Sequence, residues 1–465
     1  MDSSQELANE KIGKLLFKFS IPAIIGLLVN AMYSVVDRIF VGRGVGSLAL
    51  SGVAITFPIT NVIMAIGMLV GTGAAAVISI KLGKKDKNGA EKIIGNAYIM
   101  TVILSILLSI LGIIFLDPLL KLLGASSETF GYAKQFATIL LAGAVLQNIG
   151  FGLNPLMRSE GAPKMAMMTM LIGAILNVMI NPLLIFVFKF GVRGSAFATV
   201  ISQTVCSVWI LIYFTKGKSL LKLRRKNMKL EKVIVREIIA IGMSPFAMQI
   251  AASIVTITFN TTLKKYGGDV AIAAFSLITS ITVLILMPLI GINQGAQPII
   301  GYNYGANNMG RVKKTLKYAC IVASCISTIG FILVQLFATQ IISIFNTSDT
   351  RLVSMGANGL AIFLKMFAFV GIQASIANYF QSIGKAKHSM FLSLSRQLIL
   401  LIPLVLILPN FFGLNGVWIA GGVSDFTSAA IAVVFIVVEN REVAEKQQRS
   451  SCQIPSAKHQ IKDKR

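Results

Sequence analysis

The chain contains the same series of long apolar segments twice, and the second copy follows the first by about 222 residues. Repeat proteins built from small stacked units have periods of about 20–50 residues, whereas the unit here is half the chain. The pattern therefore predicts two similar lobes that arose by internal duplication. Landmark residues recur in the same order in both copies: Pro22 and Pro245, Asp37 and Asn260, Gly73 and Gly295, Gly83 and Gly305, Gly191 and Gly413, Gly194 and Gly416.

Both copies consist of segments that are long enough to cross a membrane. Hydrophobic residues make up 55% of the chain and charged residues 13%, which is too apolar for a soluble domain. A helix needs about 20 apolar residues to cross a bilayer. We therefore expect an all-α integral membrane protein with twelve transmembrane helices in two six-helix bundles. The expected spans are 15–40, 49–80, 93–116, 132–156, 165–188, 194–215, 237–262, 271–302, 315–338, 353–380, 388–409 and 416–438.

The polar segments divide the chain into five parts. We expect an N-terminal segment (1–14), a first lobe (15–215), a basic linker (216–236), a second lobe (237–438) and a polar tail (439–465) with little fixed structure.

The distribution of basic residues predicts the orientation of the chain. The net charge is +25, and 32 of the 43 Lys and Arg residues fall on one side of the membrane if the N-terminus is cytoplasmic. Positively charged loops stay on the cytoplasmic side, so we expect a multi-pass protein of the plasma membrane with both termini in the cytoplasm. This placement favours membrane lipids, and not nucleic acid, as partners of the basic segments.

Signatures of ATP hydrolysis, metal chemistry and disulfide frameworks are missing from the sequence. The only Gly-Lys-Ser sequence, at 217–219, has Ile212 where the first glycine of a phosphate-binding loop belongs. Two histidines supply little material for metal or triad chemistry, and the four cysteines do not suggest paired disulfides. We therefore expect neither an enzyme nor a cofactor.

Two carboxylates, Asp37 and Asp425, lie well inside predicted spans. Ionisable groups are costly in a bilayer and are usually functional, and a transporter driven by an ion gradient needs a carboxylate that can exchange H⁺ or Na⁺. Asp37 is the stronger candidate, because Arg396 falls at the depth of Asp425 and predicts a structural ion pair there. Lys365, in the tenth span, is expected to be a further buried charge without an assigned partner.

Polar residues of the first lobe are expected to lie near Asp37. Asn177 and Asn181 are four residues apart and share one face of the fifth helix, and Thr199 lies in the sixth. One carboxylate with amide and hydroxyl oxygens is a ligand set for a hard cation such as Na⁺. Alternatively, Asp37 pairs with a neighbouring arginine, Arg38 or Arg43, and the asparagines join helices by hydrogen bonds. The residues alone leave both interpretations open.

Several segments, taken together, resemble the multidrug and toxic compound extrusion (MATE) family over roughly residues 12–438. The resemblance implies two six-helix bundles around a V-shaped central cleft, and export of amphipathic, often cationic compounds in exchange for Na⁺ or H⁺. It also implies that Asp37, Asn177, Asn181 and Thr199 form a cation site and that Pro22 marks a bend in the first helix. The segments are 36–43, 48–53, 158–161, 177–182 and 194–200.

Two positions depart from the usual pattern of that family. Asn181 stands where Asp is common, and Ser253 stands where some members carry an acid in the seventh helix. The cation site then has one carboxylate, which a single monovalent ion neutralises. Because the missing acid weakens a Na⁺ site more than a protonation site, the sequence favours H⁺.

Asn260 and Gln294 are expected to line the substrate cavity of a monomeric transporter for amphipathic or cationic drugs. One alternative is a lipid-linked oligosaccharide flippase of the same superfamily, which usually has fourteen helices. The other is a membrane protein without transport activity.

Overall fold

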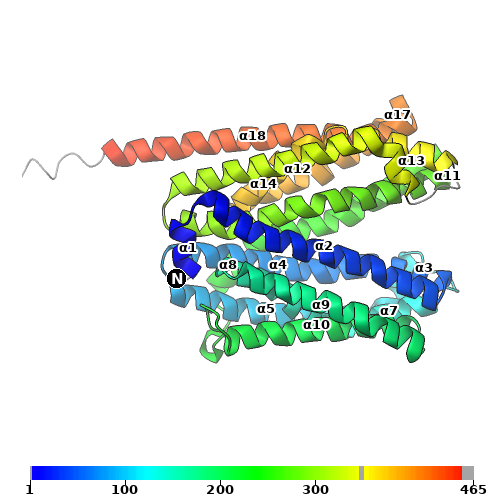
Figure 1. The fold of residues 1–465 in the computed structure, drawn as a ribbon, viewed down its shortest axis with the longest axis horizontal. Coiled ribbons are helices and arrows are strands. Elements are labelled where there is room, and N and C mark those ends of the chain that lie inside the picture. Colours follow the sequence, from blue (N-terminus) through cyan, green and yellow to red (C-terminus); the bar gives the residue numbers. More distant parts are fainter. Residues whose placement is uncertain (1–2, 345–349, 453–465) are drawn as a thin grey trace, which may run out of the picture.

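The protein is a bundle of long helices (Figure 1). The structure, a computed structural model, describes residues 3–344 and 350–452, and this part of the chain contains no β-strand. Nine of its helices are long and apolar enough to cross a membrane, and two bent helix pairs supply further crossings. Because the 74-residue α11 leaves helical geometry at Gly268 (φ 70°, ψ −164°), it supplies two crossings. The described residues thus contain the expected twelve.

The first lobe follows a short helix, α1 (Ser3–Asn9). Its six crossings are α2 (Ile12–Gly44), α3 with α4 (Ser47–Ile55, Phe57–Gly83), α5 (Lys87–Ile114), α7 with α8 (Phe130–Ala142, Ala144–Ser159), α9 with the π-helical η1 (Pro163–Pro182, Leu183–Val187) and α10 (Val192–Thr215). The short α6 (Leu116–Leu122) joins α5 to α7, and η2 (Arg225–Asn227) lies in the linker.

The second lobe repeats this order. Its crossings are the two parts of α11 (Lys232–Gly305), α12 (Met309–Ser343), α13 with η3 and α14 (Thr350–Phe363, Phe367–Phe369, Val370–Ser382), α15 with the π-helical η4, α16 and α17 (Ala386–Leu394, Ser395–Leu401, Ile402–Ile407, Pro409–Phe412), and α18 (Leu414–Cys452).

Three sequence-based expectations need correction. Lys365 is exposed and not buried, because the tenth crossing breaks there and its two halves meet at 45°. The linker is shorter than expected, since α11 begins at Lys232. The tail is helical as far as Cys452, because residues that favour helix, such as Glu, Lys, Gln and Arg, continue α18 beyond the membrane span. Residues 453–465 lie outside the described part.

The first described helix, α1, and the C-terminal end of α18 lie at the same end of the bundle, on the left in Figure 1. We call this end the termini face, and the end that carries α3 and α17 the opposite face.

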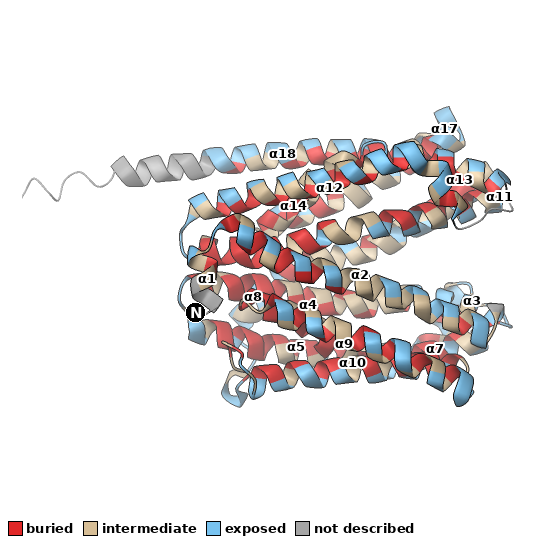
Figure 2. Ribbon diagram, in the orientation of Figure 1, coloured by how far each residue is buried: buried red, intermediate tan, exposed pale blue. Residues whose placement is uncertain are grey.

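Glycines let the two lobes approach closely near the termini face. A Cβ at Gly83 of α4 would collide with the carbonyl oxygen of Tyr302 in α11, and a Cβ at Gly305 would collide with that of Ile80. The contact is reciprocal, since Gly83 and Gly305 are landmark residues of the duplication. Only a hydrogen atom fits at such a crossing, and therefore glycine is needed. Figure 2 shows α4 buried between its neighbours.

The basic linker is folded onto the first lobe. Glu160, in the connection between α8 and α9, accepts hydrogen bonds from the Tyr213 hydroxyl, from Ser219 Oγ (2.8 Å) and from the Leu221 amide (3.1 Å). Burial raises the pKa of the Glu160 carboxyl to about 7, although these hydrogen bonds act in the other direction. The linker therefore belongs structurally to the first lobe.

Candidate functional site

Asp37 lies in the half of α2 that points to the opposite face, and two side chains donate to one of its oxygens. Ser195 Oγ, from α10, lies 2.7 Å from Asp37 Oδ1, and Asn181 Nδ2, from α9, donates to the same atom. Asn181 and Ser195 are fully buried, and Asp37 is half-buried. The carboxylate thus joins α2 to both α9 and α10.

A second hydrogen bond lies one helical turn away. Asn177 Nδ2 donates to Thr199 Oγ1 at 3.3 Å. Asn177 precedes Asn181 by four residues in α9, and Thr199 follows Ser195 by four residues in α10, so each helix presents both of its residues on one face. The structure therefore places all four residues predicted from the sequence in one region between three helices.

Two oxygen atoms of this region lack a partner. Asn177 Oδ1 and Asn181 Oδ1 are buried and accept no hydrogen bond from any residue that the structure describes. A buried polar atom left unpaired costs roughly 1–3 kcal/mol, and such an atom calls for an explanation, for example an ion or a water molecule. One carboxylate with two free amide oxygens is an oxygen donor set that suits a monovalent hard cation. The described residues contain no group of three or more His, Cys, Asp or Glu side chains that could hold a metal.

Local backbone features bring these side chains together. Asn181 is followed by Pro182, which cannot donate a backbone hydrogen bond, and α9 widens there into the π-helical η1. Gly191 then adopts a positive φ of 59° and turns the chain directly into α10. The tight connection places Ser195, in the first turns of α10, beside Asn181.

Ser195 was missed in the sequence analysis. Its position four residues before Thr199 was the available signal, because a helix presents both hydroxyls on one face.

Neither arginine proposed as an alternative partner forms an ion pair with Asp37 in the described part of the chain. The Arg38 guanidinium packs over the Phe57 ring, 4.8 Å from its centroid. The ion pairs found in the described part of the chain include neither Asp37 nor Arg43. Asp37 is therefore held by neutral donors.

The second lobe contains a carboxylate in a different environment. Arg396 Nε lies 2.7 Å from Asp425 Oδ1, and the Asp425 side chain is only 6% exposed. Ser424 Oγ donates to the Arg396 carbonyl at 2.6 Å. These contacts join η4 to α18. Because Asp425 already has a positive partner, it needs no bound cation.

The assignment of Asn260 and Gln294 to a substrate cavity remains a prediction. Asn260 lines an open cavity of about 440 Å³ with Thr261, Lys264 and Lys265. Gln294 is not among the residues that line this cavity, and its Oε1 is buried without a partner. Two lysines make the cavity at Asn260 unfavourable for a cationic compound.

Comparison with known proteins identifies the family. The MatE family model matches the chain twice, at residues 22–183 and 245–407. The chain therefore belongs to the MatE family. One match falls in each lobe, and the matches begin at the paired prolines, which confirms the internal duplication.

Several similar proteins match nearly the whole chain. Multidrug export protein MepA of Staphylococcus haemolyticus (strain JCSC1435) is 27% identical over 440 residues, which are 94% of this chain and 96% of the relative. A solved structure described as the outward-facing conformation of a multidrug resistance MATE family transporter is 27% identical, with a TM-score of 0.89 over 96% of this chain and 99% of that one. A crystal structure of MATE in complex with MaL6 has the same identity and TM-score and covers 95% and 99%. The two-lobed membrane transporter fold is thereby confirmed.

Proposed function

We propose that the chain is a secondary active antiporter of the plasma membrane. It exports amphipathic, cationic compounds in exchange for one monovalent cation bound at Asp37. The observation that carries this proposal is a half-buried carboxylate with no ion-pair partner in the described residues, in a site with two unpaired amide oxygens. The names of the MepA relatives support drugs as the transported class. Twelve crossings favour this function over a fourteen-helix flippase.

The orientation and the partners are part of the same proposal. The basic segments of the termini face support a cytoplasmic position for that face, with lipid headgroups as neighbours. The protein acts as a monomer.

The path of α2 suggests how ion binding and export are connected. Near Asp37, α2 is tied to α9 and α10 of the first lobe. Near Ser20 it crosses α11 of the second lobe so closely that only glycine fits at Gly295. Pro22 lies within α2 close to this crossing and removes a backbone hydrogen bond there, which makes the helix easier to bend. A cation at Asp37 therefore changes the helix that bridges the two lobes, and it can favour one arrangement of them.

The unpaired oxygens bear on the identity of the ion. The sequence alone favours H⁺. A proton on Asp37, however, supplies a single O–H donor and can pair at most one of the oxygens of Asn177 and Asn181, whereas Na⁺ can bind both together with the carboxylate. We therefore propose Na⁺ as the exchanged ion.

Removal of a ligand, Asn177, or of the Thr199 hydroxyl to which Asn177 donates, is expected to weaken Na⁺ activation of export. Asn177→Ala and Thr199→Ala should each raise the Na⁺ concentration for half-maximal export on the order of tenfold, which corresponds to roughly 1.4 kcal/mol. The measurement is the initial rate of export of a fluorescent cation from proteoliposomes as a function of Na⁺ at fixed pH.

Thr204→Ala is the matched control, because the hydroxyl of this half-buried threonine donates to the Val200 carbonyl of its own helix, α10. Its Na⁺ dependence should equal that of the wild type. Wild-type Na⁺ dependence in both site variants would rule out the proposed ligand set.

A further inference from the structure

The short helix that precedes the first lobe is bound by the second lobe. α1 lies at the termini face (Figure 1), and Leu7 at its end is only 1% exposed. The Leu7 carbonyl accepts hydrogen bonds from Asn303 Nδ2 (3.3 Å) and Arg311 Nη2 (3.1 Å). The Glu10 carbonyl accepts a third from Arg311 Nη2 at 2.8 Å. The end of α1 is thus held by residues of α11 and α12.

Arg311 is oriented for this contact by its own lobe. Its Nε donates to Asn303 Oδ1 at 2.9 Å, and Asn303 is 1% exposed in the last turn of α11. The last carbonyls of a helix have no partner within the helix and carry partial negative charge. A guanidinium that meets them forms charge-assisted hydrogen bonds, which are stronger than neutral ones.

The same helix is also attached to the first lobe, through α2. Glu6 forms an ion pair with Lys18, and Glu10 Oε1 lies 3.0 Å from Lys14 Nζ. Between the two helices, Lys11 has extended backbone angles (φ −58°, ψ 130°). α1 therefore bridges the lobes and is joined to α2 by two non-helical residues, Glu10 and Lys11.

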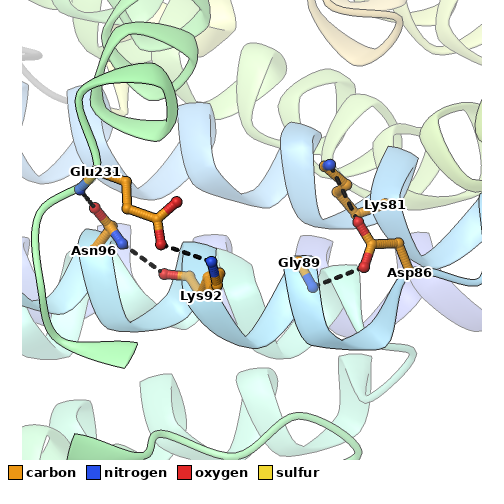
Figure 3. Close-up of polar contacts among 6 residues, drawn as sticks. All are labelled: Lys81, Asp86, Gly89, Lys92, Asn96 and Glu231. Carbon is orange, nitrogen blue, oxygen red and sulfur yellow. Dashed lines mark hydrogen bonds and ion pairs between the residues drawn. The ribbon is translucent and has the colours of Figure 1, made fainter. Parts of the chain in front are cut away.

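The second lobe has a corresponding connection to the first. Glu231, which lies 222 residues after Asn9, immediately precedes α11. Its amide donates to Asn96 Oδ1 at 2.8 Å, and its carboxylate lies 2.8 Å from Lys92 Nζ (Figure 3). In each half of the duplication, the segment before the first crossing is therefore bound by the other lobe.

We propose that α1 acts as a latch that keeps the two lobes together at the termini face. Arg311 and Asn303 hold the latch in place by their hydrogen bonds to its end. The latch is closed while the lobes touch at this face. Separation of the lobes there requires Arg311 to release the carbonyls of Leu7 and Glu10, or α1 to turn about Lys11 and leave α2. The inference rests on the proposed alternation between two arrangements of the lobes, and it adds a contact that sets their relative populations.

The test measures lobe separation without ion or drug. Ser79 of α4 is fully buried against Gly301 of α11, so the thiol introduced by Ser79→Cys, in a background with the native cysteines replaced by serine, reports the gap between the lobes. Arg311→Gln should make a maleimide added from the termini side modify this thiol about tenfold faster. A tenfold change corresponds to a loss of roughly 1.4 kcal/mol in the stability of the closed arrangement. Arg311→Lys keeps the charge but loses the paired donors, and it should give an intermediate rate.

Lys313→Gln is the matched control, because Lys313 is an exposed cation of the same helix. It should leave the modification rate unchanged. Equal rates in Arg311→Gln and Lys313→Gln would overturn the latch. If Arg311→Gln does not fold, Arg311→Lys decides the question in the same comparison. Because no transport is measured, failure of the latch is distinguishable from failure of the antiport function.

Discussion

Asp37→Asn is expected to abolish ion-driven export while the protein still folds. The amide has nearly the shape of the carboxylate, but it cannot be protonated and adds no negative charge to a cation site. The site would then hold no ion, and α2 would lose its response to the gradient. Export of a fluorescent cation from proteoliposomes should fall to the rate of liposomes without protein, while the size-exclusion profile remains that of the wild type.

A second carboxylate serves as the control for this result. Asp117 is half exposed and pairs with Lys134 at 2.8 Å, so it has a positive partner that Asp37 lacks among the described residues. Asp117→Asn should export at the wild-type rate. Wild-type export by Asp37→Asn would remove Asp37 from the mechanism.

Neutralisation of either member of the ion pair in the second lobe is expected to destabilise the protein. Asp425→Asn or Arg396→Gln leaves the other charge buried without its partner, which costs about 3–5 kcal/mol for a buried pair. We expect the lower end of this range, because the Arg396 side chain is 23% exposed. The measurement is the folded yield and the thermal denaturation temperature in detergent.

The double variant, Asp425→Asn with Arg396→Gln, should recover part of the loss, since it leaves no unpaired charge. The exposed pair of Asp117 and Lys134 supplies the comparison, and its neutralisation should change stability by less than about 1 kcal/mol. Normal stability together with lost export in Asp425→Asn would instead assign Asp425 to transport.

The fold was predictable because membrane spans and duplication leave strong signals in the sequence. The lengths of the apolar segments predict the crossings. The two lobes are marked by the paired landmarks, Pro22 with Pro245 and Gly83 with Gly305. The breaks inside crossings were not predictable, since the bend between α7 and α8 (59°) and the break at Lys365 depend on packing against neighbouring helices. The helical tail is not predictable from its polar composition, because the same composition is typical of disordered segments.

The candidate site was predictable in part. The spacing of Asn177 and Asn181 placed both on one helix face, and the depth of Asp37 pointed to the same level of the lobe. Ser195 is an ordinary buried serine until the turn at Gly191 places it beside Asp37. The contact between Arg311 and α1 has no signal in the sequence, because nothing there indicates that the N-terminal helix crosses to the other lobe.

The most direct test of Na⁺ exchange at Asp37 follows both fluxes at once. Purified protein is reconstituted in liposomes with the same clamped pH on both sides, and radioactive Na⁺ and a fluorescent cation are measured together. We expect Na⁺ to cross the membrane in the direction opposite to the drug, and only when drug is present. Asp37→Asn should show no Na⁺ movement. Drug movement that requires a pH gradient and carries no Na⁺, or Na⁺ exchange that persists in Asp37→Asn, would contradict this mechanism.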